Sequence, residues 1–95
     1  MAQTKTIGHH ATSIHTDNDM IIVTYHNTEV VKFNSSTIIL NTGGYYTYTT
    51  KTRMNQASNQ YNLGYRVFQK NFDWFIQYHN KTILFKTDHI ALCRD

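Results

Sequence analysis

Hydrophobic and polar positions follow two different periods along this chain of 95 residues. Short runs rich in β-branched and aromatic residues, with apolar and polar positions alternating in part, are typical of half-buried strands. Such runs occupy residues 20–26, 29–33, 37–40, 45–49, 65–69, 72–78, 82–85 and 89–92. Turn-forming residues separate them, for example Asn34-Ser35-Ser36 between the second and third runs. The pattern predicts seven or eight short antiparallel strands.

One segment has a helical period instead of a strand period. Thr49 or Thr50 can cap the start of a helix that runs to about residue 61, and Gly64 can end it. The residues expected on its buried face, at spacings of four, three and four, are Thr50, Met54, Ala57 and Tyr61. The residues expected on the opposite face, exposed to solvent, are Thr52, Asn55, Gln56 and Asn59. We expect the apolar face to pack on the sheet.

Together these elements predict an α+β domain in which a small antiparallel β-sheet, strongly curled or barrel-like, packs about one short helix. A chain of this length forms one domain, so residues 1–95 are expected to be a single unit. Residues 1–18 are polar and lack a sustained period, so we expect a loosely ordered arm or an added edge strand. The turn at 41–44, Asn-Thr-Gly-Gly, is expected to reverse the chain between two strands.

The amino-acid composition indicates the cellular compartment of the protein more clearly than its function. The formal net charge of +3 permits an anionic partner, but a dedicated DNA-binding domain is far more basic. The single cysteine excludes an internal disulfide framework and suits a reducing cytoplasm. No apolar run reaches the length of a membrane span, and no signal peptide is visible. We therefore expect a cytoplasmic protein. The short chain buries a modest core, which favours a homo-oligomer.

The chain shows no recognisable catalytic motif. His9, His10 and His15 lack a zinc-binding spacing, although zinc ligands can also come together from distant strands. Cys93 and His89 could form a nucleophile pair, but no oxyanion loop accompanies them. The carboxylates show no paired arrangement, and the glycine turn is not followed by a Walker-A lysine. We predict no catalytic residue, no metal site and no cofactor, and hence a non-enzymatic protein.

The start of the predicted helix is the best candidate for a binding site. Aromatic faces, cations and side-chain amides lie together there, as in sites that hold a nucleotide or a nucleic-acid strand. A helix N-terminus also offers backbone N–H groups to a phosphate. The candidate ligand-binding residues are Lys51, Arg53, Asn55, Gln56, Tyr46, Tyr48, Arg66 and Trp74. A solvated polar helix face over a tyrosine-rich core would produce the same pattern.

The segment from Leu40 to Gln56 resembles a motif in small accessory proteins encoded by tailed bacteriophages. In that group an L-N-T/S-G-G-aromatic turn is followed by T-T-K-x-R-M-N-Q, an N-L-G-aromatic step and an aromatic strand. The matching residues here are 40–56, 62–65 and 72–75. The resemblance implies an accessory protein that acts in an infected bacterium, and it carries over no catalytic residue.

Three binding functions fit these observations. The first is non-enzymatic binding of a nucleotide-type anionic ligand, which could sequester a host defence signal. The second is inhibition of a host defence or metabolic enzyme through direct protein contact. The third is binding of single-stranded nucleic acid, which would weaken steeply with salt. The expected partners are therefore a small nucleotide ligand or a host protein, with nucleic acid as a further candidate and no membrane.

Overall fold

The computed structural model describes residues 12–44 and 46–94. These residues form eight strands and one helix, namely β1 (Thr12–Asp17), β2 (Met20–Tyr25), β3 (Thr28–Phe33), β4 (Thr37–Asn41), α1 (Tyr48–Tyr61), β5 (Arg66–Lys70), β6 (Asp73–Tyr78), β7 (Lys81–Leu84) and β8 (His89–Cys93). The prediction of a small α+β protein with antiparallel strands and one short helix is confirmed. Residues 12–17, expected as an arm or an edge strand, form β1 at the edge of a sheet.

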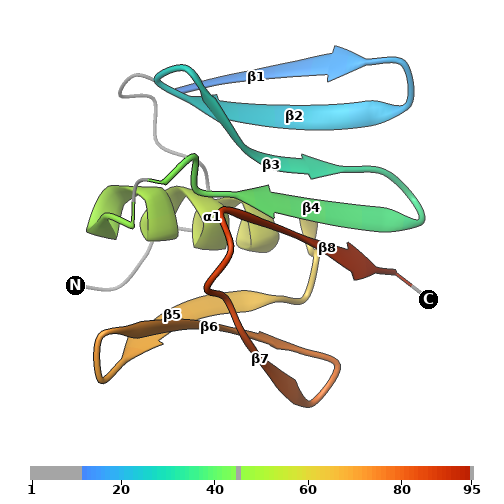
Figure 1. Cartoon of the computed structure of the whole chain (residues 1–95). Helices are drawn as coiled ribbons and strands as arrows, with labels where there is room; N and C mark the ends of the chain where they lie inside the picture. The colour runs from blue at the N-terminus through green and yellow to red at the C-terminus, as the bar shows by residue number, and fades with distance from the viewer. Residues whose placement is uncertain (1–11, 45, 95) are drawn as a thin grey trace.

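The strands form two separate sheets. Five strands lie in the order β1-β2-β3-β4-β8 and three in the order β5-β6-β7, and every neighbouring pair is antiparallel. Figure 1 shows α1 between the five-stranded sheet and the three-stranded sheet. The prediction of a single, strongly curled or barrel-like sheet is therefore wrong. After β4 the chain enters α1 instead of a further strand, and β8 later returns to pair with the edge of β4.

The segment 45–49 was expected to be a strand, and the structure does not bear this out. Thr47 has an extended backbone and is the N-cap of α1, because its side-chain oxygen accepts a hydrogen bond from the Thr50 N–H at 3.2 Å. The helix therefore begins at Tyr48, earlier than expected. Tyr and Thr favour strands, but the first N–H groups of a helix need acceptors, and Thr47 supplies one. Tyr45 lies outside the described residues.

The glycine turn keeps its predicted backbone but not its predicted connection. Gly43 and Gly44 have positive φ angles of 63° and 86°. A Cβ atom on Gly43 would lie 2.9 Å from the side chain of Thr28, so a larger residue would also clash there. The Thr42 N–H donates to the Asp88 carbonyl at 2.7 Å, at the point where β8 takes its place beside β4. The turn thus directs the chain out of the sheet and toward α1.

The capping role of Thr47 can be tested by substitution. Thr47→Ala is expected to lower the free energy of unfolding by about 1 kcal/mol, because the helix loses its N-cap acceptor. Urea denaturation measures this change. Thr49→Ala, two positions further on and within α1, is the control and should have little effect, since alanine is a good helix former. Equal losses in the two variants would contradict the assignment of Thr47 as the cap.

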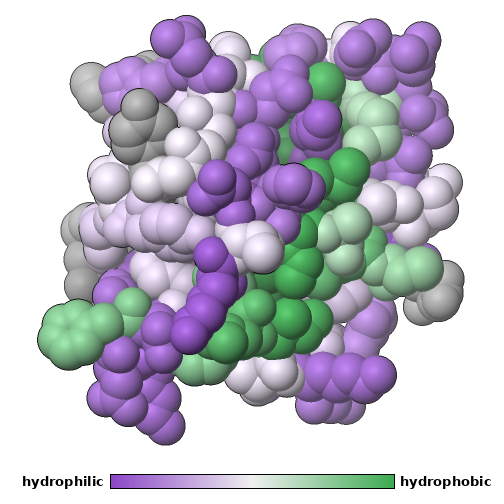
Figure 2. Space-filling view, in the orientation of Figure 1, coloured by the Kyte–Doolittle hydropathy of each residue, from purple (hydrophilic) through white to green (hydrophobic). Residues whose placement is uncertain are grey.

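The core lies between α1 and the inner faces of the two sheets. Its most deeply buried side chains come from both sheets and from the helix, and they include Val23, Val31, Ile38, Leu40, Met54, Ala57, Val67, Ile76 and Phe85. Figure 2 shows that hydrophobic side chains also form a band on one face of the molecule, bordered by hydrophilic residues. Because α1 contacts β2, β3 and β5, two sides of the helix are covered by protein. A single apolar stripe on the helix could not predict the second covered side.

Polar side chains of α1 join the helix to the start of the three-stranded sheet. The Asn55 amide donates to the Val67 carbonyl at 2.8 Å and accepts from the Val67 N–H at 2.7 Å. The Ser58 hydroxyl donates to the Tyr65 carbonyl at 2.7 Å and accepts from the Tyr65 N–H at 3.1 Å. Backbone groups of Val67 on the free edge of β5, and of Tyr65 just before this strand, are thereby paired with side chains where another strand would otherwise be needed.

Candidate functional site

The structure divides the predicted ligand-binding residues into three groups. The first group, Tyr46, Tyr48, Lys51 and Trp74, does come together at the start of α1 and is here named the aromatic–lysine cluster. Lys51 Nζ lies 5.6 Å from the centre of the Tyr48 ring and 5.9 Å from that of Trp74. The rings of Tyr46 and Trp74 meet edge to face, with centroids 5.1 Å apart. Trp74 is only 3% exposed, so its ring has little surface on which a base could stack.

An open hollow of about 380 Å³ lies beside this cluster. It is lined by Tyr46, Gln69, Phe72, Asp73, Trp74, Phe85 and Lys86, and we name it the aromatic hollow. The Tyr46 hydroxyl is within 3.0 Å of the carbonyl oxygens of Lys86 and Thr87, which fixes one wall of the hollow. Aromatic rings and the tip of the β5–β6 hairpin thus form its border.

The second group, Arg53, Asn55 and Gln56, is buried. Arg53 Nε donates to the Thr12 hydroxyl at 2.9 Å, and its Nη1 donates to the Gln56 side-chain carbonyl at 3.1 Å. Asn55 is bonded to the backbone of Val67, as described above. The expectation that Asn55 and Gln56 face solvent is therefore wrong, because this side of α1 is covered and its polar groups bond to protein. In this arrangement Asn55 connects the helix to β5.

The third group is Arg66 alone. It is exposed and lies on the opposite face of β5 from the buried Val67. Its guanidinium carbon lies 6.0 Å from the centre of the Phe68 ring. Arg66 is therefore not part of the aromatic–lysine cluster.

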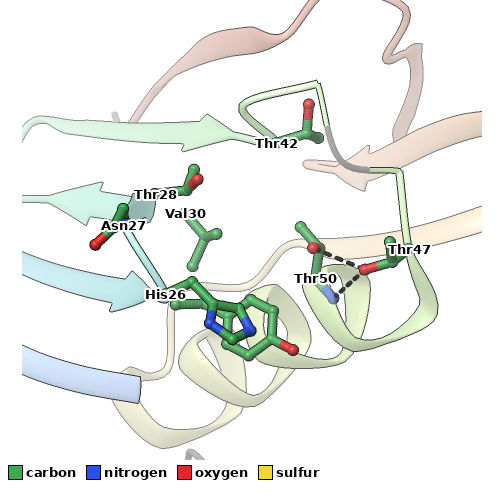
Figure 3. A pocket seen from close by; sticks show the side chains of 8 residues that line it. His26, Asn27, Thr28, Val30, Thr42, Thr47 and Thr50 are labelled. Atoms are coloured by element: carbon green, nitrogen blue, oxygen red, sulfur yellow. Dashed lines mark hydrogen bonds between the residues drawn. The ribbon is translucent and has the colours of Figure 1, made fainter. Parts of the chain in front are cut away.

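A second hollow lies between the β2–β3 turn and the N-terminus of α1, with a volume of about 360 Å³ (Figure 3). It is lined by Tyr25, His26, Asn27, Thr28, Val30, Thr42, Thr47 and Thr50, and we name it the threonine pocket. In Figure 3 the side chains of His26, Val30 and Thr50 point into the space between the strands and the first turn of the helix. Sequence reasoning did not find this pocket, because the β2–β3 turn, which lies outside the motif that holds Thr42, Thr47 and Thr50, supplies its other walls.

The threonine pocket combines hydrogen-bonding groups with the positive end of a helix. Thr47 and Thr50 hydroxyls lie 2.9 Å apart on its wall, and both belong to the N-terminus of α1. The first turn of the helix contains no acidic residue. The rings of Tyr25 and His26 are in contact, with centroids 4.4 Å apart. The pocket can therefore offer hydroxyl, amide and imidazole groups to a polar ligand, and aromatic surface to a flat one.

Within residues 12–44 and 46–94, no three His, Cys, Asp or Glu side chains are grouped so that they could hold a metal ion. In the same part of the chain, no helix has the length and apolar character that crossing a bilayer requires.

A protein-family model described as "Kyanoviridae Gp96 protein" matches residues 1–91 of the chain. No curated protein and no solved structure matches the chain.

Proposed function

The chain belongs to the Kyanoviridae Gp96 protein family, and from this phage origin we propose that it binds a small nucleotide-type anion in the threonine pocket. The resemblance to phage proteins inferred from the sequence is confirmed at the level of the family. We propose binding without turnover, in the cytoplasm of the infected bacterium. Tight binding of this kind would withdraw a nucleotide signal that the host uses in defence.

The observation that carries the proposal is the N-terminus of α1 in the wall of the pocket. Helix N-termini attract phosphate, because the helix dipole and the N–H groups of the first turn favour negative charge there. Here Thr47 already pairs the Thr50 N–H, so the dipole provides much of the attraction. Thr47 and Thr50 add two hydroxyls at the same place. Lys51, predicted from the sequence, lies in the same turn of the helix, but its ammonium group lies against Tyr48 and Trp74 and does not line the pocket.

The remaining walls suit the uncharged parts of a nucleotide. Tyr25 and His26 present aromatic surface for a base, and Asn27 and Thr28 present polar groups for a sugar. A volume of about 360 Å³ lies at the small end of the range for ligand sites, roughly 300–1,000 Å³. The pocket therefore favours a mononucleotide over a larger ligand.

Isothermal titration calorimetry with the four ribonucleoside monophosphates tests the proposal, with inorganic phosphate and a nucleoside as separate arms. We expect the monophosphates to bind more tightly than either fragment.

His26→Asn is expected to weaken nucleotide binding about three- to tenfold, because the shorter asparagine side chain removes the imidazole from the wall of the pocket. Asparagine tolerates the left-handed backbone of His26, whose φ is 56°, so the variant should fold.

His79→Asn is a matched control for this experiment. His79 also has a left-handed backbone, with φ 51°, but it lies in the β6–β7 turn and does not line the threonine pocket. Its substitution should leave nucleotide affinity unchanged. Absence of binding by every monophosphate would overturn the proposal. Salt-dependent binding of single-stranded oligonucleotides alone would favour the nucleic-acid alternative instead.

A further inference from the structure

The tip of the β5–β6 hairpin exposes a large hydrophobic side chain. Phe72 is 94% exposed, the highest value among the exposed large hydrophobic residues of the described chain. It therefore gains almost nothing from contact with its own chain. A phenylalanine ring left in water forgoes the burial that normally stabilises it.

The backbone of Phe72 is also strained. Asn71 and Phe72 connect β5 to β6 with φ angles of 52° and 72°, the left-handed values that a tight hairpin turn requires. Glycine, asparagine and aspartate are favoured at such positions, whereas a bulky side chain raises the free energy. Among the described residues other than glycine, every other residue with positive φ is Asn or His. Phe72 thus has both an unfavourable backbone conformation and a hydrophobic ring exposed to water. Contacts within one chain offset neither of these costs.

The hollow that could receive such a ring lies next to the tip. Phe72 itself stands at the border of the aromatic hollow, whose other walls include Tyr46, Trp74 and Phe85. Tyr46, which is 40% exposed, offers the aromatic surface against which a phenyl ring can pack edge to face or offset, whereas the buried Trp74 and Phe85 expose little of their rings. The volume of about 380 Å³ exceeds what one phenylalanine side chain needs. A projecting ring and a matching hollow therefore lie side by side on the same surface.

We propose that two copies of this chain associate about a two-fold axis at this surface, each inserting Phe72 into the aromatic hollow of the other. A two-fold contact uses the same patch on both subunits, so the inserted Phe72 and the hollow that receives it must both belong to that patch. Phe72 and the hollow meet this condition because they are adjacent. If they were far apart on the chain's surface, the same contact would build an open filament rather than a closed dimer.

Charged residues of both signs border the tip of the hairpin. Lys70 and Asp73 face each other across the hairpin, and Lys86 lines the hollow. In a two-fold pairing, Asp73 of one copy can approach Lys70 or Lys86 of the other, which pairs opposite charges at the rim. The contact is small, so we expect a dimer that dissociates on dilution. The threonine pocket shares no lining residue with the aromatic hollow.

Sedimentation velocity of the full chain over a series of concentrations tests the proposal. The wild-type chain should shift from monomer to dimer as its concentration rises, and Phe72→Gly should raise the dissociation constant at least about tenfold. Ile14→Ala, which removes another exposed hydrophobic side chain on β1, is the matched control and should dimerise like wild type. A wild-type chain that stays monomeric throughout, or a Phe72→Gly chain that dimerises normally, would overturn the proposal.

Two further measurements separate the proposed contact from other roles of Phe72. At a concentration where the chain is monomeric, Phe72→Gly should not lower the melting temperature, because glycine adopts the same backbone without strain. A lower melting temperature would mean that Phe72 serves the monomer. A photo-crosslinking amino acid at position 72, in mixed isotope-labelled and unlabelled chains, should link to Tyr46, Gln69 or Lys86 of a second copy. Cross-links confined to other surfaces would contradict the assigned interface.

Discussion

Replacing Asn55 by alanine is expected to lower the free energy of unfolding by about 2–4 kcal/mol. The substitution removes both hydrogen bonds between the Asn55 amide and the backbone of Val67, at 2.8 and 2.7 Å. It would leave the Val67 N–H and C=O without these partners where α1 packs on β5, and each such group costs roughly 1–3 kcal/mol. Urea denaturation followed by circular dichroism measures the loss.

Asn59→Ala is the matched control for this prediction. Asn59 lies on the same helix but is exposed, and its substitution removes the same side-chain atoms as Asn55→Ala. We expect its free energy of unfolding to stay within about 0.5 kcal/mol of wild type. A further variant, Asn55→Asp, keeps the acceptor but removes the donor. Its free energy of unfolding at neutral pH should be well below that of wild type. Similar stabilities for Asn55→Ala and Asn59→Ala would show that the link between α1 and β5 contributes little.

The second large effect concerns alkaline pH. Burial raises the pKa of Tyr65 well above its ordinary value near 10, and its hydroxyl donates to the Met54 carbonyl at 2.5 Å. In the unfolded chain this hydroxyl ionises near pH 10, whereas in the folded chain it stays protonated. Its contribution to stability is therefore complete below pH 10. Above pH 10 the contribution falls by about 1.4 kcal/mol for each pH unit, because only the unfolded chain gains from ionisation.

Urea denaturation of wild type and Tyr65→Phe at several pH values from 8 to about 12 isolates this contribution from other titrating groups. At pH 8 the variant should be less stable by about 1 kcal/mol, since it lacks the hydrogen bond to Met54. The difference should shrink and then reverse as the pH rises. Tyr48→Phe, at a tyrosine that is 58% exposed, should follow the wild-type curve. If the free energies of unfolding of wild type and Tyr65→Phe changed with pH in parallel, the burial of Tyr65 would not be the cause of the alkaline loss of stability.

Local patterns in the sequence were sufficient to predict most of the strands. Residues 20–26, 29–33 and 72–78 correspond closely to β2, β3 and β6, because the alternation that predicts a strand is contained within it. The helix was also predicted, but not its start. Thr47 belongs to a run of tyrosines and threonines that favours a strand, and only its capping bond reveals the helix.

The composition of the candidate site was harder to predict. A polar side chain on a helix is normally expected in water, yet Asn55 and Ser58 are buried and bond to the backbone of Val67 in β5 and of Tyr65 just before it. Which side of α1 is covered depends on where the three-stranded sheet lies, and that position is set by contacts between distant segments. The threonine pocket illustrates the same point, since Thr28, Thr42 and Thr50 meet only after the chain has folded.

The contact between Thr42 and Asp88 bears on whether the segment between them could be exchanged for another. The Thr42 N–H and the Asp88 carbonyl are 2.7 Å apart, so the chain leaves the five-stranded sheet and returns to it at one point. Segments whose two ends are adjacent can be varied or exchanged with little disturbance to the fold that carries them. The segment between Thr42 and Asp88 has adjacent ends, but it also supplies Met54, Val67 and Ile76 to the core. Exchanging this segment for another would therefore require repacking against the five-stranded sheet as well as closing the chain at one point.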